Sequence, residues 1–212
     1  VIYEGNFTSY GANLSGTHPG GRIKLNYPNT YLADVNKLSM EIYVKSVGEK
    51  NNTTTGFGAR LIDFMKYSQY DHYTDGEWGY TFHRLGNQDN WILIDRRNQD
   101  YSATATGIIL QDSWSHIVLT IDEYNDELAI YENGSNVGKN VTNLNILHTL
   151  NTFMVGNDNR NQKSLAGYIA YFRLWKNHIL TDTEVKRLYY RTIEPEPEPE
   201  PEPEQLYQGD TL

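Results

Sequence analysis

The stretch from Asp112 to Val137, DSWSHIVLTIDEYNDELAIYENGSNV, decides the fold. Its first part alternates with bulky side chains on both faces, which predicts a strand that is covered on both sides. The polar run Glu123–Asp126 predicts a turn, and Leu128–Tyr131 predicts a returning strand. Asn133-Gly134 supplies the left-handed residues that a second tight hairpin needs. Two hairpins so close together predict an antiparallel all-β protein.

Length and composition agree with a single β sandwich. The chain has 212 residues, of which 13% are aromatic, including 17 tyrosines. This length is ample for one core, and tyrosine favours strands over helices. The chain has no cysteine, which excludes disulfides and any cysteine-based metal or redox site.

Charge is concentrated at the C-terminus. The formal net charge is −9, of which −7 falls after Arg191, so the body carries about −2. A nearly neutral body with no basic run argues against nucleic acid and anionic membranes as partners. No apolar run approaches the roughly 18 residues of a membrane span, which argues against membrane insertion.

Alternating segments elsewhere predict the remaining strands. Leu38–Lys45 is predicted to point Glu41 and Tyr43 outward, and Phe57–Met65 to point Arg60 to one side and Asp63 to the other. Residues 11–21 are predicted to be a loop, and residues 98–106 are a polar segment in which no strand is predicted. The other predicted strands are Val1–Ser9, Arg22–Asn26, Tyr80–Leu85, Trp91–Asp95, Phe153–Gly156 and Gly167–Trp175.

One short helix and an acidic tail close the chain. Residues 181–184, Thr-Asp-Thr-Glu, predict a capping box, and the helix is expected to end near Arg191. Glu194–Glu204 alternates Glu and Pro, so we expect a polyproline II spacer about 34 Å long. The predicted organisation is a sandwich over 1–191, a spacer over 192–204, and a short tail or the start of a further segment over 205–212, within a larger parent protein.

Several motifs resemble laminin-G-like domains of the concanavalin A-like lectin/glucanase superfamily. Trp114–Asp122 followed by Leu128–Gly134 resembles the central strand signature of that family. Phe153–Asn157, Leu165–Trp175 and Leu180–Val185 resemble its closing segment. The resemblance implies a two-sheet antiparallel jelly-roll sandwich with one short C-terminal helix.

The segment Lys66–Gly79 is the first candidate for ligand binding, because it lacks an apolar period and is predicted to be a long loop. Aromatic rings beside carboxylates suit the apolar faces and polar edges of sugars, although the same rings could instead pack on the sandwich edge. A second polar loop, Asn157–Lys163, contains the positively charged candidate residue Arg160. The predicted ligand-binding residues are Tyr67, Tyr70, Tyr73, Trp78 and Arg160.

Calcium is the second candidate, because the resemblance implies a metal site at the rim of the sandwich. Ca²⁺ takes about six to eight oxygen ligands, which two adjacent loops could supply. No contiguous Asp-x-Asp-x-Asp loop is present, and the alternative is that these side chains are solvated. The positions that match the family's site are Asp71, Asp75, Asn157 and Asp158, with Asn159 as a further match.

Hydrolysis is the third candidate and the one that the sequence favours least. Glucanases of the same superfamily carry Glu-x-Asp-x-x-Glu on one strand, and this chain lacks that pattern. Its densest acidic run, residues 122–127, falls on the predicted turn, where we expect it to be solvated. His116 belongs to the strand signature and is expected to be a packed histidine. The chain is therefore predicted not to be an enzyme.

These observations predict a non-catalytic recognition module that binds a glycan or glycoprotein. We expect it to be extracellular, displayed on a cell or virion surface. The alternative is a structural building block of a capsid, fibre or filament, with self-assembly or neighbouring domains engaged through the Glu-Pro tail. If the host glycosylates proteins, its Asn-x-Ser/Thr sites would mark exposed loops. These sites are Asn6, Asn13, Asn51, Asn52, Asn133 and Asn140.

Overall fold

The fold is known from a computed structural model, whose described residues form the strands β1–β14 and helix α1. The described residues are 2–4, 6–8, 11–13, 22–26, 32, 34–46, 57–65, 79–85, 90–95, 102–106, 113–141, 147, 150, 152–156, 165 and 167–193.

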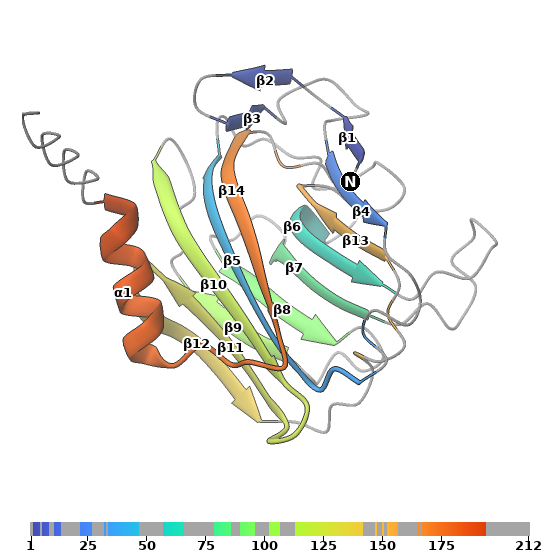
Figure 1. Ribbon diagram of the computed structural model, residues 1–212, viewed down its shortest axis with the longest axis vertical. Coiled ribbons are helices and arrows are strands. Elements are labelled where there is room, and N and C mark those ends of the chain that lie inside the picture. The colour runs from blue at the N-terminus through green and yellow to red at the C-terminus, as the bar shows by residue number, and fades with distance from the viewer. Residues whose placement is uncertain are drawn as a thin grey trace, which may run out of the picture.

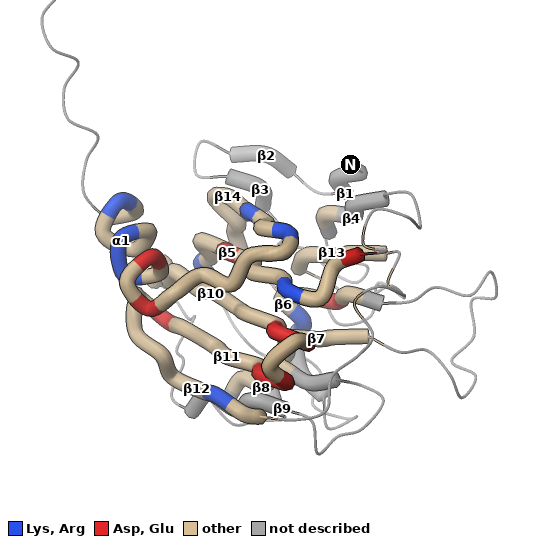
Figure 2. The backbone as a smooth tube through the Cα atoms, turned by 60° about the horizontal axis from the view of Figure 1, so that its bottom comes forward, with Lys and Arg blue, Asp and Glu red and all other residues tan. Residues whose placement is uncertain are grey.

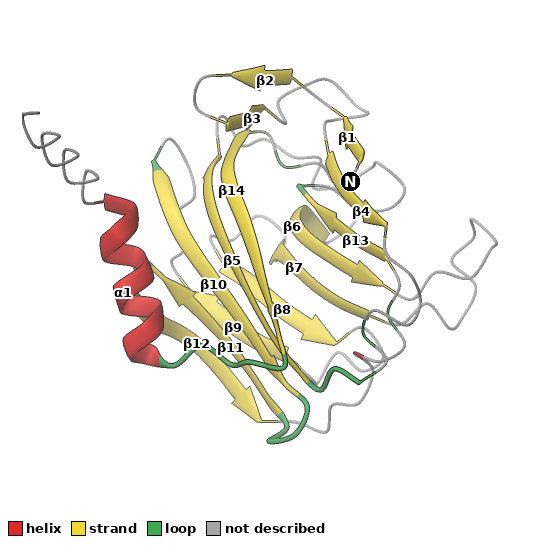
Figure 3. Ribbon diagram, in the orientation of Figure 1, coloured by secondary structure: helices red, strands yellow, loops and turns green. Residues whose placement is uncertain are grey.

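Two seven-stranded sheets face each other, and their strands pair antiparallel (Figures 1 and 3). Sheet A contains, in spatial order, β1 (Ile2–Glu4), β4 (Arg22–Asn26), β13 (Thr152–Val155), β6 (Phe57–Met65), β7 (Gly79–Leu85), β8 (Asn90–Asp95) and β9 (Ser102–Thr106). Sheet B contains β12 (Ser135–Val141), β11 (Glu127–Glu132), β10 (Trp114–Asp122), β5 (Lys37–Ser46), β14 (Gly167–Lys176), β3 (Gly11–Asn13) and β2 (Asn6–Thr8). The predicted all-β sandwich is confirmed.

The two hairpins predicted within the deciding stretch are both present. β10 pairs with β11 across the turn at residues 123–126, and β11 pairs with β12 across Asn133 and Gly134. Asn133 has φ 49° and Gly134 has φ 80°, as a tight left-handed hairpin turn requires. A β-carbon added to Gly134 would lie 3.1 Å from the Cδ1 atom of Tyr189, so glycine also provides room for the helix above it.

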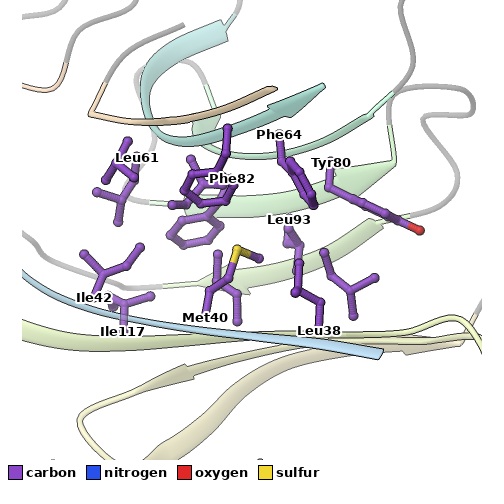
Figure 4. Close-up of a cluster of buried hydrophobic side chains, with 14 of the residues drawn as sticks. Leu38, Met40, Ile42, Leu61, Phe64, Tyr80, Phe82, Leu93 and Ile117 are labelled. Atoms are coloured by element: carbon purple, nitrogen blue, oxygen red, sulfur yellow. The ribbon is translucent and has the colours of Figure 1, made fainter. Parts of the chain in front are cut away.

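The core fills the space between the sheets. Met40, Ile42 and Ile117 of sheet B meet Leu61 and Phe82 of sheet A there (Figure 4). In a second part of this core, the Phe153 ring of sheet A lies 5.0 Å from the Phe172 ring of sheet B, centroid to centroid, and 5.2 Å from Phe64. Aromatic rings of the two sheets therefore pack against each other in the core.

Three predictions about the strands are wrong. The opening segment is not one strand, because β1 belongs to sheet A and β2 to sheet B. Residues 11–13 form strand β3 within a segment predicted to be a loop, and residues 102–106 form strand β9 within a polar segment in which no strand was predicted. In β6, irregular pairing on both sides of Arg60 breaks the expected alternation. The consequence of that bulge for the candidate site is described below.

Helix α1 (Asp182–Ile193) lies on the outer face of sheet B, the face turned away from the core (Figure 1). A small second core holds it there. This core consists of Val118, Ala129, Tyr131, Leu180 and Val185, with Trp175 and Leu188 packed against it. The helix continues two residues beyond the predicted end at Arg191. In the described part of the chain, no helix is long and apolar enough to cross a membrane.

The predicted capping box at the start of α1 is confirmed. The backbone N–H of Glu184 donates to the Thr181 hydroxyl at 3.3 Å, and the backbone N–H of Thr181 donates to the Glu184 carboxylate at 2.9 Å. These reciprocal bonds satisfy amides that the first helical turn leaves without partners.

Thr181→Ala should therefore lower the free energy of unfolding by about 1 kcal/mol, since the cap is lost while the helix sequence is unchanged. Urea denaturation followed by far-ultraviolet circular dichroism measures the change. Thr183→Ala, at the next exposed threonine inside the helix, is the matched control and should change stability little. Equal effects of the two substitutions would contradict the capping role.

Candidate functional site

The nine residues predicted to bind a ligand or calcium lie outside the described residues. Their segments are nevertheless attached to described strands: residues 66–78 join β6 to β7, and residues 157–164 follow β13. The two segments leave at opposite ends of the β6–β13 pairing, since Thr152 pairs with Met65 whereas the Gly156 N–H donates to the Leu61 carbonyl. The nine assignments stay predictions.

Four polar side chains are buried on the outer face of sheet A, on the two strands that residues 66–78 join. Arg60 and Asp63 come from β6, and Thr81 and His83 from β7; each is at most 4% exposed. Arg60 pairs across the strands with His83, and Asp63 pairs with Thr81. We call these four residues the sheet A cluster.

The β-bulge in β6 creates this cluster. In a regular strand, residues three apart point to opposite faces, as the sequence predicted for Arg60 and Asp63. The bulge inserts an extra residue into β6 and turns both side chains to the same face. There the Arg60 guanidinium donates to the Asp63 carboxylate at 2.7 Å. No local sequence pattern marked the bulge, so the prediction for Arg60 was wrong.

The side chains of the sheet A cluster contact one another within each strand, Arg60 with Asp63 on β6 and Thr81 with His83 on β7. The Arg60–Asp63 pair is a charge-assisted hydrogen bond, stronger than a neutral one. The Thr81 hydroxyl lies 3.1 Å from Nδ1 of His83 and completes a polar strip across β6 and β7. Because both members of the ion pair are buried, a change to either one exposes the other to a large desolvation cost.

A second polar cluster lies on the outer face of sheet B, centred on the fully buried Glu41 of β5. Its carboxylate accepts hydrogen bonds from His116 at 2.8 Å, from the Tyr171 hydroxyl at 3.1 Å and from Arg173 at 3.0 Å. These partners come from β10 and β14, the two strands that flank β5. The outward direction predicted for Glu41 is correct, but its burial was not predictable from the strand alone.

His116 is the packed histidine that the sequence predicted. A carboxylate only accepts hydrogen bonds, so Nε2 of His116 carries the proton that is donated to Glu41. The other ring nitrogen, Nδ1, is buried without a hydrogen-bond partner. The Tyr189 ring of α1 lies 5.9 Å from the imidazole ring, centroid to centroid. This arrangement fixes the histidine in place and leaves it no access to solvent.

Glu41 is held ionised by its partners. Burial alone would raise its pKa, but the hydrogen bond from His116 and the charge of Arg173 outweigh burial and hold the pKa below the ordinary value of a glutamate, 4.5. Burial also raises the pKa of Tyr171 to about 12, so this hydroxyl keeps the proton that it donates to Glu41.

A pH dependence of stability follows from Glu41. Because its pKa is lower in the folded than in the unfolded protein, its contribution is present above pH 4.5 and is lost as the pH falls below that value. Urea midpoints measured from pH 7 down to pH 3 should show this loss, and Glu41→Gln should flatten the acid limb of the profile. A Glu41→Gln profile parallel to that of the unaltered protein would show that the carboxylate does not contribute.

A row of aromatic rings lies beside Glu41 on the same face. The Tyr43 ring stacks on Trp114 at 4.9 Å and on Tyr171 at 5.7 Å, centroid to centroid. The Arg173 guanidinium lies 4.5 Å from the centre of the Tyr171 ring. We call Trp114, Tyr43, Tyr171 and Arg173 the sheet B row. Its three rings are half-buried and Arg173 is exposed.

The acidic run at residues 122–127 is structural where the sequence predicted a solvated turn. Asp122 is buried and accepts the backbone N–H groups of Tyr124 and Asn125, both at 3.1 Å. Glu123 accepts the Tyr80 hydroxyl and the Leu147 N–H, both at 2.8 Å. The prediction of solvation is therefore wrong for Asp122. The bonds of Glu123 join the β10–β11 turn to Tyr80 of β7 and to Leu147. Among the described residues, no group of three His, Asp or Glu side chains could hold a metal ion.

Comparisons with known protein families and solved structures agree with the two-sheet fold. Residues 19–186 match the family described as the concanavalin A-like lectin/glucanases superfamily, Laminin_G_3. The chain belongs to this family. The resemblance seen in the strand signature and closing segment is thereby confirmed. A comparison with curated protein sequences gives no match.

Solved structures of the concanavalin A-like fold resemble the chain at low identity. The binding domain of botulinum neurotoxin DC in complex with SialylT is 14% identical, with a TM-score of 0.61 over 90% of this chain and 46% of that one. A heptameric SAP-like pentraxin from Limulus polyphemus is 17% identical, with a TM-score of 0.53 over 73% of this chain and 70% of that one. The chain thus spans about half the length of the toxin binding domain, and these likenesses show the fold.

Proposed function

We propose that this protein is a non-catalytic recognition module that binds glycan along the rim of sheet A. The sheet A cluster carries this proposal, because its four buried polar residues lie on the two strands that the aromatic segment Lys66–Gly79 connects. Fixed strand ends reduce the conformational entropy that a binding segment loses when it engages a ligand. The contacts themselves would come from the predicted aromatic residues and Arg160.

Glycan is the favoured ligand class for two reasons. The segment between β6 and β7 combines tyrosine and tryptophan with carboxylates, which suits the apolar faces and hydroxyl edges of sugars. In addition, a structurally similar toxin binding domain is described in complex with SialylT. This likeness supports the ligand class but does not specify a particular sugar.

Binding without hydrolysis is favoured by the state of the buried carboxylates. Glu41 is bound to His116 and Arg173, and Asp63 is bound to Arg60. Glycoside hydrolysis uses a pair of carboxyl groups about 5–10 Å apart across the sugar, one of them available as an acid. Glu41, whose pKa is lowered, is a poor acid, and Asp63 accepts a hydrogen bond from the Arg60 guanidinium, so these residues are suited to supporting the fold.

Calcium remains a prediction for Asp71, Asp75, Asn157 and Asp158. Their segments leave β6 and β13 at opposite ends of the pairing, so the loop of residues 66–78 would have to reach along the sheet for all four to meet. Calorimetric titration with calcium, together with melting in the presence of a chelator, tests the site. Absence of both binding heat and a chelator effect would remove the metal from the proposal.

A glycan array tests the proposed function directly. Trp78→Ala and Tyr73→Ala should each lower binding by at least about fivefold, because each removes a ring worth about 1 kcal/mol or more in a sugar contact. Tyr124→Ala is the matched control, since this ring is 73% exposed on the β10–β11 turn and should leave binding unchanged.

The array also separates the proposal from the structural alternative. A folded protein that binds no glycan on the array and assembles as its concentration is raised would favour a building block of a fibre or capsid. Binding that survives both Trp78→Ala and Tyr73→Ala would place the contact elsewhere on the sandwich. The expected display on a cell or virion surface is part of the same proposal.

A further inference from the structure

The sheet B row lies away from the proposed glycan site, on the outer face of the other sheet. Its rings come from three adjacent strands: Trp114 from β10, Tyr43 from β5 and Tyr171 from β14. Glu41 anchors one end of the row by accepting hydrogen bonds from Tyr171 and Arg173. The row is therefore a rigid, partly exposed strip of aromatic edges, and the recognition function proposed above does not use it.

Helix α1 ends beside this row. The Thr192 hydroxyl lies 2.7 Å from the Tyr171 hydroxyl, one residue before the helix ends at Ile193. The next residues in the sequence are the alternating glutamates and prolines of Glu194–Glu204. This segment therefore begins next to Tyr171, which gives it a high effective concentration at the row.

The charges around the row complement those of the segment. Arg173 is exposed at one side of the row, and Lys45 of β5 is paired with Trp114 at the other. Helix α1 also carries exposed basic residues, Lys186 and Arg187 in its middle and Arg191 in its last turn (Figure 2). The segment carries six glutamates and no basic residue. The charge of the segment is thus opposite to that of the described residues around the row.

We propose that the sheet B row is a docking surface for the chain's own Glu-Pro segment. Aromatic rows bind proline-rich segments because proline is already restricted to the polyproline II conformation and loses little entropy on binding. Proline rings would pack on Tyr171, Tyr43 and Trp114. The intervening glutamates would pair with Arg173, Lys45 and Arg191 at the end of α1.

The dimensions of the row allow this contact. The successive centroid distances of 5.7 and 4.9 Å define the path from Tyr171 to Trp114. Polyproline II rises about 3.1 Å per residue, so about four residues cross the row. Glu194–Glu204 is long enough to cross it and still leave residues beyond Trp114. Docking would hold the start of the spacer against the sandwich and would direct whatever follows it away from α1.

A spin label on the full-length chain tests the contact. The chain has no cysteine, so Glu198→Cys provides a unique site for a nitroxide. Paramagnetic broadening of backbone amide signals should be strongest at residues 43, 114 and 171 and should be unchanged when the protein is diluted. It should be lost in Arg173→Gln and at high salt, where exposed charges are screened.

Lys139→Gln is the matched control for Arg173→Gln. Lys139 is 52% exposed and paired with Glu127, much as Arg173 is 53% exposed and paired with Glu41, but it lies on β12. The Lys139→Gln substitution should leave the paramagnetic broadening at residues 43, 114 and 171 unchanged. A second variant changes every glutamate of the segment except the labelled position to glutamine, which leaves the sandwich untouched and should also abolish the broadening.

Two outcomes would overturn the proposal. Absence of broadening at the row in the unaltered, labelled chain would show that the segment does not dock. Broadening that disappears on dilution would show that the row binds the segment of a second copy. Neither outcome bears on glycan binding, because the array is read at the opposite sheet.

Discussion

Asp63→Ala should lower the free energy of unfolding by about 3–5 kcal/mol, because it leaves the buried Arg60 guanidinium without its carboxylate. The side chains of Arg60 and Asp63 are only 4% and 1% exposed, so water is not available to replace the lost interaction. Guanidinium chloride denaturation, followed by tryptophan fluorescence, measures this change. The same substitution should weaken glycan binding if the sheet A cluster holds the strands beside the aromatic segment.

Two further variants separate the buried pair from a general effect of removing a carboxylate. Replacing both partners, as Arg60→Met with Asp63→Leu, should recover most of the lost stability, because no unpaired charge is then left inside. Glu127→Ala removes the partner of the half-exposed Lys139 and should change stability by no more than about 1 kcal/mol. A similar loss of unfolding free energy in Asp63→Ala and Glu127→Ala would show that burial of the Arg60–Asp63 pair does not determine the size of the loss.

Phe153→Ala should lower the free energy of unfolding by a similar amount, about 3–5 kcal/mol. The side chain is fully buried, and its ring contacts Phe64 within sheet A and Phe172 of sheet B. The substitution removes a large apolar group and leaves a cavity at the point where the two sheets meet. The urea midpoint at constant denaturant slope measures the loss.

Phe153→Leu is the control for this substitution, since it keeps most of the buried volume and removes only the aromatic contacts. We expect it to cost distinctly less than Phe153→Ala. A cost below about 1 kcal/mol for Phe153→Ala would mean that the neighbouring side chains collapse into the space, and that this ring does not join the sheets.

The sequence predicts the parts of the fold that depend on local patterns. Alternation over Trp114–Asp122 gives the central strand, Asn133-Gly134 gives the second hairpin, and Thr181 with Glu184 gives the helix start. Each of these signals lies within a few residues and follows from backbone geometry or a short-range hydrogen bond. The family resemblance then supplied the arrangement of the two sheets.

The polar clusters could not be predicted in the same way. Glu41 and His116 are 75 residues apart, and only the pairing of β5 with β10 brings them together. Arg60 and Asp63 share a face because of a bulge that has no short sequence signature. The sequence-predicted ligand and calcium residues lie outside the described residues, so for that part of the site the predictions rest on residue chemistry alone.

The small second core beneath α1 has a mechanical consequence. The helix is attached to sheet B by the apolar side chains of this second core, by the Tyr131–Asp182 hydrogen bond of 2.8 Å, by the Thr192–Tyr171 contact of 2.7 Å and by the Tyr189 ring beside His116, all separate from the main core. A pulling force applied through the C-terminal tail would act on these contacts between α1 and sheet B before it acted on any strand. The helix would therefore peel away first, lengthening the tether and relieving the load while the sandwich and its rim stayed intact.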